Sequence, residues 1–322
     1  MEKRKIIIDC DPGVDDALAL AYAAANLQAF ELLAVTTVSG NQTVEKVTRN
    51  ALNLTEFYGL EVPVAKGASE PITRKAVYAP EVHGNTGLGY CTLPTAKKQL
   101  ASGNAVTFLR EVIMAQPEGE QVTLVPVGPM TNIALLLKTF PEVKSRIREI
   151  IFMGGAARGG NTTPAAEFNI YVDPEAASVV FHSGIPMVMC GLDATQKCAL
   201  SKNQIMKFCQ SGNEVAKACG DMVGFTLDTY NKYRGEASIH DVVPLMYMLH
   251  PEIFKAEKAV LDVDCSQGVS RGSTLCDLRW WNYDAEDLKD VVLLDADKEK
   301  FQEYLITAIY ELGEALEGSK GK

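Results

Sequence analysis

Short runs of β-branched and aliphatic residues alternate with longer segments of helical periodicity along most of the chain. The expected strands are Lys5–Asp9, Leu32–Ser39, Val62–Ala65, Gln121–Val127, Glu149–Met153 and Pro186–Cys190. The expected helices are Val14–Leu27, Thr43–Tyr58, Ala105–Ala115, Met130–Phe140, Asp173–His182 and helical stretches from Ser201 to about Tyr233. Such alternation is typical of βαβ units. We therefore predict an α/β fold with an open, mostly parallel central sheet and helices on both faces.

The pattern continues without a repeat, a low-complexity tract or a linker, so we expect one domain over residues 1–316. Hydrophobic residues make up 47% of the chain, which is enough for a large core. Val260–Val263 and Val291–Leu294 are expected to be late strands that can join the sheet antiparallel. A terminal helix is expected from about Lys298 to Ala315, followed by a flexible tail at residues 317–322.

The charge balance and the apolar runs exclude several classes of partner. Lys plus Arg total 31 against 41 Asp plus Glu, and the net charge of -10 argues against nucleic acid or an anionic membrane. No segment approaches the roughly 20 apolar residues that span a bilayer. The run Ile6–Ile8 ends at Asp9, too early for a signal-peptide core. The 8 cysteines are scattered without a CxxC pair, as in reduced cytosolic thiols. We expect a cytoplasmic protein with a small substrate.

Four aspartates, Asp9, Asp11, Asp15 and Asp16, follow the first expected strand. Grouped carboxylates repel one another, so either their pKa values rise or a hard divalent cation neutralises them. The helix dipole favours acids in a first helical turn without any metal, but two acids suffice for that purpose. Four acids therefore favour a metal site.

Polar loops follow several expected strands. They are Asp9–Asp16 after the first strand, Ser39–Asn41 after the second, Val127–Asn132 after the central one and Met153–Gly155 after the next. Ligands of open parallel sheets bind at the carboxyl ends of the strands. We expect these loops to converge on one cleft.

Other acidic or phosphate-binding motifs fit the loop poorly. An EF-hand would need glycine at Val14 and glutamate at Leu20, and no glycine-rich phosphate cradle follows the first strand. Asp9-x-Asp11 is similar to the motif of haloacid-dehalogenase-type phosphohydrolases, but the segment Pro12–Asp16 departs from that pattern.

The chain closely resembles the nucleoside hydrolase family, the inosine-uridine type of nucleoside N-ribohydrolase, whose opening signature is D-x-D-P-G-x-D-D-A. The resemblance continues through Asn41, His83–Leu88, Val125–Asn132, Met153–Gly155, Gly160–Asn169, Asp173–Ala177 and His240-Asp241. It implies the nucleoside hydrolase fold and hydrolysis of the N-glycosidic bond of ribonucleosides to free base and ribose.

The resemblance also implies a role for each matched residue. A Ca²⁺ ion would be held by Asp11, Asp16, the backbone carbonyl of Val127 and Asp241. Asp11 would take a proton from the calcium-bound water that attacks the sugar, and His240 would protonate the leaving base. The implied ribose contacts are Asp15, Asn41, Asn161, Glu167 and Asn169. The implied neighbours of the base are His83, Met153, Phe168, Tyr230 and Arg234, although aromatic residues at helical spacing are equally expected in a core.

Three points stay open at this stage. Purine-specific relatives carry Trp where this chain has His83, which leaves an inosine/uridine or a pyrimidine (uridine/cytidine) preference. A metal-dependent phosphohydrolase and a non-catalytic nucleoside-binding protein are the alternative functions, and the presence of both Asp11 and His240 counts against the second. By analogy with relatives we expect a homodimer or homotetramer.

Overall fold

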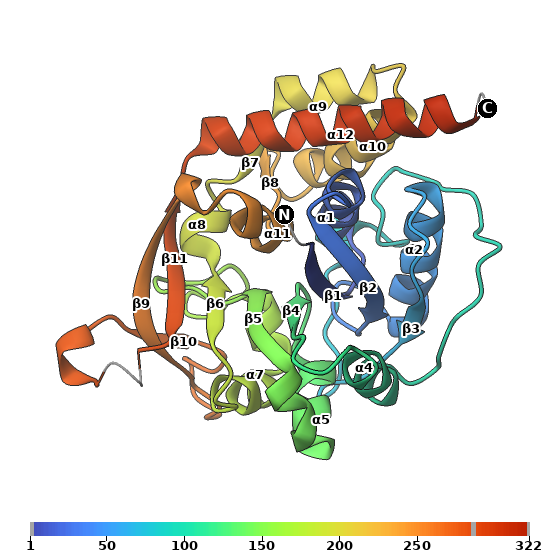
Figure 1. The fold of residues 1–322 in the computed structure, drawn as a ribbon. Coiled ribbons are helices and arrows are strands. Elements are labelled where there is room, and N and C mark those ends of the chain that lie inside the picture. Colours follow the sequence, from blue (N-terminus) through green and yellow to red (C-terminus); the bar gives the residue numbers. More distant parts are fainter. Residues whose placement is uncertain (1–2, 285–287, 321–322) are drawn as a thin grey trace.

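The computed structural model describes residues 3–284 and 288–320. These residues form a 9-stranded sheet in the order β10-β9-β11-β6-β5-β4-β1-β2-β3 (Figure 1). Its strands are β1 (Arg4–Cys10), β2 (Phe30–Thr37), β3 (Val64–Lys66), β4 (Val122–Pro126), β5 (Ile147–Met153), β6 (Met187–Cys190), β9 (Phe254–Val263), β10 (Thr274–Asp277) and β11 (Asp290–Ala296). The pairs from β3 through β11 are parallel, and within this sheet β9 and β10 are the two described strands that join antiparallel. The predicted open, mostly parallel sheet is confirmed.

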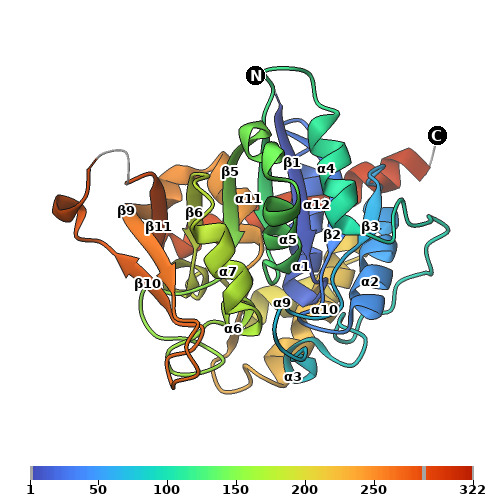
Figure 2. The same cartoon turned by 90° about the horizontal axis from the view of Figure 1, so that it is seen from below.

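Helices cover both faces of this sheet (Figures 1 and 2). They are α1 (Val14–Ala25), α2 (Val44–Phe57), α3 (Pro80–His83), α4 (Ala105–Met114), α5 (Thr131–Thr139), α6 (Phe168–Val172), α7 (Pro174–Phe181), α8 (Leu192–Thr195), α9 (Lys202–Cys209), α10 (Glu214–Asp228), α11 (Val242–Leu249) and α12 (Lys298–Lys320). Helices α10, α11 and α12 pack on α1, and α4 and α7 pack on α5. Short 3₁₀ turns lie at Pro141–Arg146, Pro251–Ile253 and Trp280–Asn282. The sheet therefore separates two helical layers.

Strand β1 shows why helices cover both faces of the sheet. Side chains of a strand alternate between its faces. Ile6 and Ile8 belong to the hydrophobic cluster that includes Leu18 of α1, whereas Ile7 belongs to the cluster that includes Leu109 of α4. All three isoleucines are at most 1% exposed. The continuous apolar run is thus divided between two cores.

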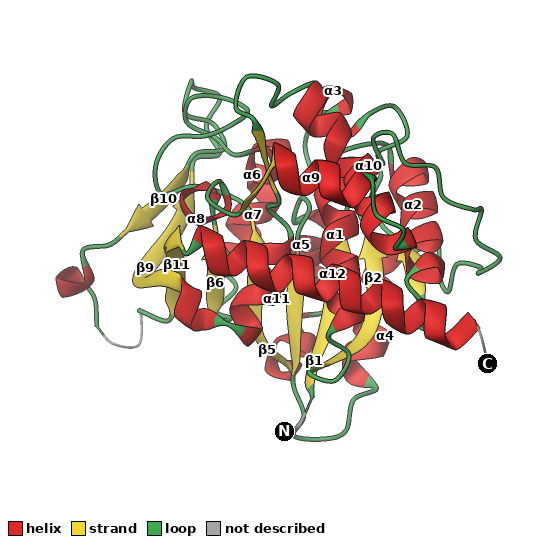
Figure 3. Ribbon diagram, turned by 90° about the horizontal axis from the view of Figure 1, so that it is seen from above, coloured by secondary structure: helices red, strands yellow, loops and turns green. Residues whose placement is uncertain are grey.

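The carboxyl ends of the parallel strands lie at one edge of the molecule, opposite the N-terminus (Figure 3). There the loops after β1, β2 and β4 are joined by backbone hydrogen bonds, Val38 N–H to the Cys10 carbonyl (3.0 Å) and Val127 N–H to the Asp9 carbonyl (2.8 Å). The predicted convergence of these loops is confirmed.

The structure differs from the sequence-based expectations at the carboxyl-terminal half. Strand β11 pairs parallel with β6, and β9 alone of the two late strands runs against its neighbours. Strand β10 and a separate antiparallel pair, β7 (Ala199–Ser201) with β8 (Glu236–Ser238), were not predicted. Helix α12 reaches Lys320 rather than Ala315, and residues 321–322 of the predicted tail lie outside the described residues. None of the described helices has the length and apolarity to cross a membrane.

Candidate functional site

The turn between β1 and α1 is organised by the carboxylate of Asp16. Its Oδ1 accepts a hydrogen bond from Asp11 N–H (3.1 Å) and its Oδ2 accepts one from Gly13 N–H (2.9 Å). These backbone groups are free because they precede the first turn of a helix, where a carboxylate is favoured. The side chain of Asn41 donates to the same Oδ2 (3.0 Å) and so connects the loop after β2. Asp16 is therefore fixed from two loops.

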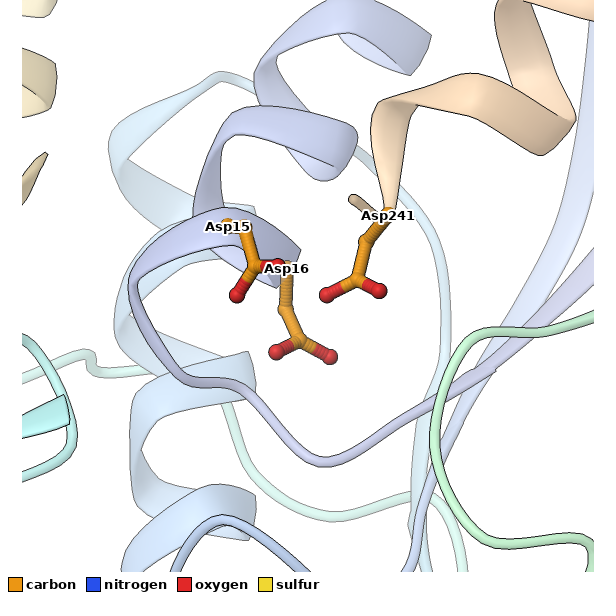
Figure 4. A group of neighbouring side chains, drawn as sticks. All are labelled: Asp15, Asp16 and Asp241. Carbon is orange, nitrogen blue, oxygen red and sulfur yellow. The ribbon is translucent and has the colours of Figure 1, made fainter. Parts of the chain in front are cut away.

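Three carboxylates face one another beside this turn (Figure 4). Asp15 and Asp16 come from the start of α1 and Asp241 from the start of α11, and one oxygen of each lies within 4.8 Å of the others. Burial, and after it the neighbouring charge of Asp16, raises the pKa of Asp15 to about 7. Burial followed by the charges of Asp15 and Asp16 raises the pKa of Asp241 well above its usual range. A cation at this point would remove the repulsion.

Asp11 has one oxygen held and one oxygen free. Its Oδ2 accepts a short hydrogen bond from Asn41 N–H (2.6 Å), and its buried Oδ1 finds no hydrogen-bond partner within residues 3–284 and 288–320. A Cβ added at Gly40 or Gly128 would lie 2.1 Å or 2.4 Å from these carboxylate oxygens, so only glycine permits the approach of both loops. Burial, then the charge of Asp16, raises the pKa of Asp11 well above its usual range.

The donor set fits a hard divalent cation. The acidic side chains gathered here, Asp11, Asp15, Asp16 and Asp241, offer carboxylate oxygens, the ligand type that Ca²⁺ and Mg²⁺ prefer. Buried like charges and an unpaired carboxylate oxygen are costly unless something compensates them. The residues present are therefore suited to a metal ion.

The opposite side of the site is held by Asn169 and Glu167. Asn169 Nδ2 donates to the carbonyls of Val127 (2.8 Å) and Met153 (3.2 Å), which ties the loops after β4 and β5 together. Glu167 caps α6 by accepting from Asn169 N–H (2.9 Å), and it also accepts from Gly155 N–H (2.9 Å). Burial raises the pKa of Glu167, and these backbone donors oppose that effect.

Two histidines approach the site with different ring environments. His83 Nδ1 accepts from Val14 N–H (3.2 Å), so the proton of its neutral ring is on Nε2. Burial, and after it the charge of His240, lowers the pKa of His83 to about 3. His240 Nδ1 instead lies 2.8 Å from the hydroxyl of Thr195, and burial followed by the charge of Arg234 lowers its pKa to about 4.

A cavity of about 280 Å³ joins these groups. The predicted site residues that line it are Asp15, Asn41, His83, Val127, Met153, Asn161, Glu167, Phe168, Asn169, Tyr230, His240 and Asp241. Asp11 and Asp16 are 0% exposed and are linked to the cavity wall by their hydrogen bonds with Asn41. The structure therefore brings the predicted metal and ribose residues together around one cavity.

Arg234 is the exception among the predicted residues. Its side chain is exposed and lines a separate surface hollow with Arg158, Lys197 and Glu236, not the cavity. Its charge reaches the site, because burial and, after it, the charge of Arg234 lower the pKa of His240. The family resemblance implied that Arg234 lies near the base, but α10 ends at Asp228 and Arg234 is exposed after the turn that follows.

Comparison with known proteins identifies the family. Residues 6–303 match the family described as inosine-uridine preferring nucleoside hydrolase. The chain belongs to the nucleoside hydrolase family. Over 279 residues, 86% of this chain and 88% of the relative, it is 42% identical to the pyrimidine-specific ribonucleoside hydrolase RihB of Escherichia coli O9:H4 (strain HS). This nucleoside hydrolase is therefore an enzyme that cleaves the N-glycosidic bond of ribonucleosides.

Solved structures agree with this assignment. A purine-preferring ribonucleoside hydrolase from Gardnerella vaginalis superposes with a TM-score of 0.88 at 31% identity, covering 97% of this chain and 100% of that one. A plant nucleoside hydrolase superposes with a TM-score of 0.87 at 26% identity, covering 96% of this chain and 99% of that one.

The cavity of this nucleoside hydrolase also has walls that the sequence did not predict. The additional lining residues are Val14, Val77, Tyr78, Ala79, Glu81, Val82, Thr162, Thr226, Asn231 and Ser238. Those from Val77 to Val82 lie in and before the short helix α3, a region without periodicity. The one usable signal was the apolar pair Val77-Tyr78 just before Pro80, which is unusual for a solvated loop.

Proposed function

We propose that this nucleoside hydrolase acts on pyrimidine ribonucleosides and depends on Ca²⁺. The base preference is supported by the 42% identity to relatives named pyrimidine-specific, against 31% to the purine-preferring structure. It is further supported by the absence of Trp280 and Trp281 from the cavity, since both are more than 60% exposed at the far edge of the sheet (64% and 65%). Uridine and cytidine are the expected substrates.

The single observation that carries the metal proposal is the buried, unpartnered Oδ1 of Asp11 beside the facing carboxylates. Asp11, Asp16, Asp241 and the Val127 carbonyl would hold the ion, with Asp15 within reach of the same point. Ca²⁺ suits this set because it accepts carboxylates and a carbonyl in irregular geometry. When bound, such a cation supplies Lewis acidity and lowers the pKa of water near it.

Asp11 is proposed as the general base. Asn41 N–H occupies Oδ2, so Oδ1, which has two lone pairs, would contact the ion with one and take the proton of the attacking water with the other. The water oxygen bonds to the anomeric carbon while the bond from that carbon to the base breaks. Positive charge develops on the sugar during this step, and surrounding carboxylates stabilise it more strongly than the neutral substrate.

His240 is proposed as the general acid. A departing base is a poor anion unless it is protonated, and His240 lines the cavity with Nδ1 already engaged by Thr195. Its Nε2 is the nitrogen left for the leaving base.

The remaining polar residues are proposed to bind ribose. Asp15, Asn41, Asn161, Glu167 and Asn169 all line the cavity, and a desolvated sugar needs each hydroxyl paired. Asn41, Glu167 and Asn169 already hold loops by hydrogen bonds, so their free lone pairs would serve ribose. His83, Met153, Phe168 and Tyr230 would surround the base. Arg234 could contact it only after a movement of its exposed loop.

A substrate panel tests the proposal. Release of reducing sugar is measured from uridine, cytidine, inosine and adenosine, before and after chelation and with Ca²⁺ or Mg²⁺ restored. The expected result is the fastest release from uridine and cytidine, lost on chelation and regained with Ca²⁺. Faster cleavage of inosine than of uridine would reject the base preference, and full activity in chelator would reject the metal.

Three further properties are proposed with the enzyme function. We infer that residues 1–316 act as one domain, that the protein works in the cytoplasm, and that it assembles as a homodimer or homotetramer. Eight free cysteines support a reducing compartment. Light scattering of the purified protein measures the assembly, and a monomer would reject it.

A further inference from the structure

We propose that Thr195 is a positioning residue for His240, holding the ring so that Nε2 meets the leaving base. The inference rests on the role proposed above for His240 as general acid. Thr195 ends α8, 45 residues before His240 in the chain, and its hydroxyl oxygen lies 2.8 Å from His240 Nδ1.

The hydroxyl of Thr195 is itself fixed in place. Thr195 is 0% exposed, and its backbone N–H donates to the Gly191 carbonyl (3.0 Å). The strand pair β7 and β8 lies between the two residues, and Ile239 N–H donates to the Cys198 carbonyl (2.8 Å) next to them. The backbones on both sides of the contact are therefore bound to each other, and the imidazole has a rigid partner.

A hydroxyl suits this position because it can both accept and donate a hydrogen bond. During leaving-group departure the electron pair of the C–N bond goes to the base, and the proton on His240 Nε2 passes to a nitrogen or oxygen of that base. The ring keeps the proton on Nδ1 and donates it to the oxygen of Thr195. Solvent restores the Nε2 proton after the products leave. The ring therefore keeps its orientation before and after the transfer.

His83 shows the effect of a different hydrogen-bond partner at Nδ1. A backbone N–H points at its Nδ1, so that nitrogen cannot carry a proton while the contact lasts. Of the two cavity histidines in the described chain, the one with the amphoteric partner is His240.

The test compares Thr195→Val, Thr195→Ser and His240→Ala in the metal-loaded enzyme. Valine has nearly the shape of threonine but lacks the hydroxyl. Thr55→Val is the matched control, because Thr55 is also 0% exposed and its hydroxyl donates only to the carbonyls of Ala51 and Leu52 in α2. Each variant is assayed on uridine and on p-nitrophenyl riboside, whose leaving group is a stable anion that needs no proton.

We expect Thr195→Val to lower kcat on uridine by about 10- to 100-fold, as misorientation of a catalytic group does, with KM nearly unchanged. Turnover of p-nitrophenyl riboside should change little, Thr195→Ser should restore most of the uridine rate, and Thr55→Val should behave as the wild type. In the double variant Thr195→Val/His240→Ala the two losses should not add.

Other outcomes separate the possible failures. Normal uridine turnover in His240→Ala would reject the acid role and this inference with it. Slow turnover in His240→Ala together with a normal Thr195→Val would reject the role of Thr195 alone. Equal losses on both substrates in Thr195→Val would mean a general structural defect and would also overturn the inference. If the valine variant does not fold, Thr195→Ala is compared with Thr195→Ser, and equal uridine turnover in the two would overturn the inference.

Discussion

The floor and the mouth of the cavity differ in how exposed their side chains are and in how much charge they carry. At the floor, Asp11, Asp15, Asp16 and Asp241 are at most 7% exposed and lie among glycines and backbone donors. At the mouth, Tyr78 and Tyr230 are 38% and 51% exposed and come from segments outside the long helices and the main sheet. One end concentrates buried charge, and the other presents accessible aromatic surface.

This difference separates what the enzyme must keep from what it can vary. Buried like charges destabilise a fold unless a ligand compensates them, so their arrangement is retained for chemistry. Exposed aromatic groups are nearly neutral for stability and can change with little structural consequence. A relative named purine-preferring shares this fold, and one named pyrimidine-specific matches 86% of this chain in sequence. Both findings are expected if the proposed sugar end is constant and the proposed base end changes.

Replacing Asp11 should produce the largest loss. Asp11→Ala removes the proposed base together with a metal ligand, and we expect kcat on uridine to fall by on the order of 10³-fold or more. The control is Asp221→Ala, which removes a partly exposed carboxylate paired with Lys217 on α10. Steady-state kinetics measures both variants. Near-normal turnover in Asp11→Ala would show that the floor does not carry the chemistry.

Removal of the metal should have an effect that depends on the residues of the floor and not on those of the mouth. Chelation should reduce activity by about 100-fold or more, because several kcal/mol of transition-state stabilisation is lost. Adding Ca²⁺ at 100 times its Kd should stabilise the fold by about 2.7 kcal/mol, seen as a rise in Tm. Asp241→Asn should lose most of that rise, whereas Tyr230→Ala should keep it. An equal rise in Tm for Asp241→Asn and the wild type would place the ion elsewhere.

Gly13 connects the two ends, so its replacement should affect both moderately. A Cβ here would lie 2.3 Å from His83 Nδ1 and 2.8 Å from Asn41 Nδ2. We expect Gly13→Ala to cost about 1–3 kcal/mol of stability, as overpacking does. It should also lower kcat/KM, since both side chains line the cavity. Gly103→Ala is the control, because a Cβ there meets nothing within 4 Å. Equal denaturation midpoints for both variants would disprove the clash.

The acidic turn of the floor was predictable from the sequence because its aspartates are contiguous, whereas Asp241, far along the chain, was named by the family resemblance. Asp9, Asp11, Asp15 and Asp16 follow an apolar strand in one loop, and the rule that ligands lie at the carboxyl ends of parallel strands placed the other loops beside it. Asp9 accepts from the Thr36 hydroxyl (2.5 Å) and from Asn132 Nδ2 (2.8 Å), which suits a residue that supports the loop.

Interactions between segments that are distant in the chain could not be predicted from the sequence in this way. Nothing in the sequence indicates that Asn41 bonds the carboxylates of Asp11 and Asp16, or that Thr195 reaches His240. The mouth is assembled from residues 77–83 and 226–231, neither of which follows an expected strand. No local pattern distinguishes such lining residues from ordinary loop or core residues, and the family resemblance that named Arg234 could not show that its side chain lines a separate hollow.

A substitution at the mouth should cause the smallest loss of activity, and this loss should appear in KM rather than in kcat. Tyr230→Ala removes an aromatic contact worth about 0.5–1.5 kcal/mol, so we expect kcat/KM on uridine to fall by roughly three- to tenfold. The loss should appear in KM, because a base contact is made equally in the ground state and the transition state. Tyr233→Ala is the matched control, since Tyr233 is 90% exposed and does not line the cavity. A kcat loss as large as that of Asp11→Ala would mean that the mouth takes part in catalysis, and the contrast with the floor would no longer hold.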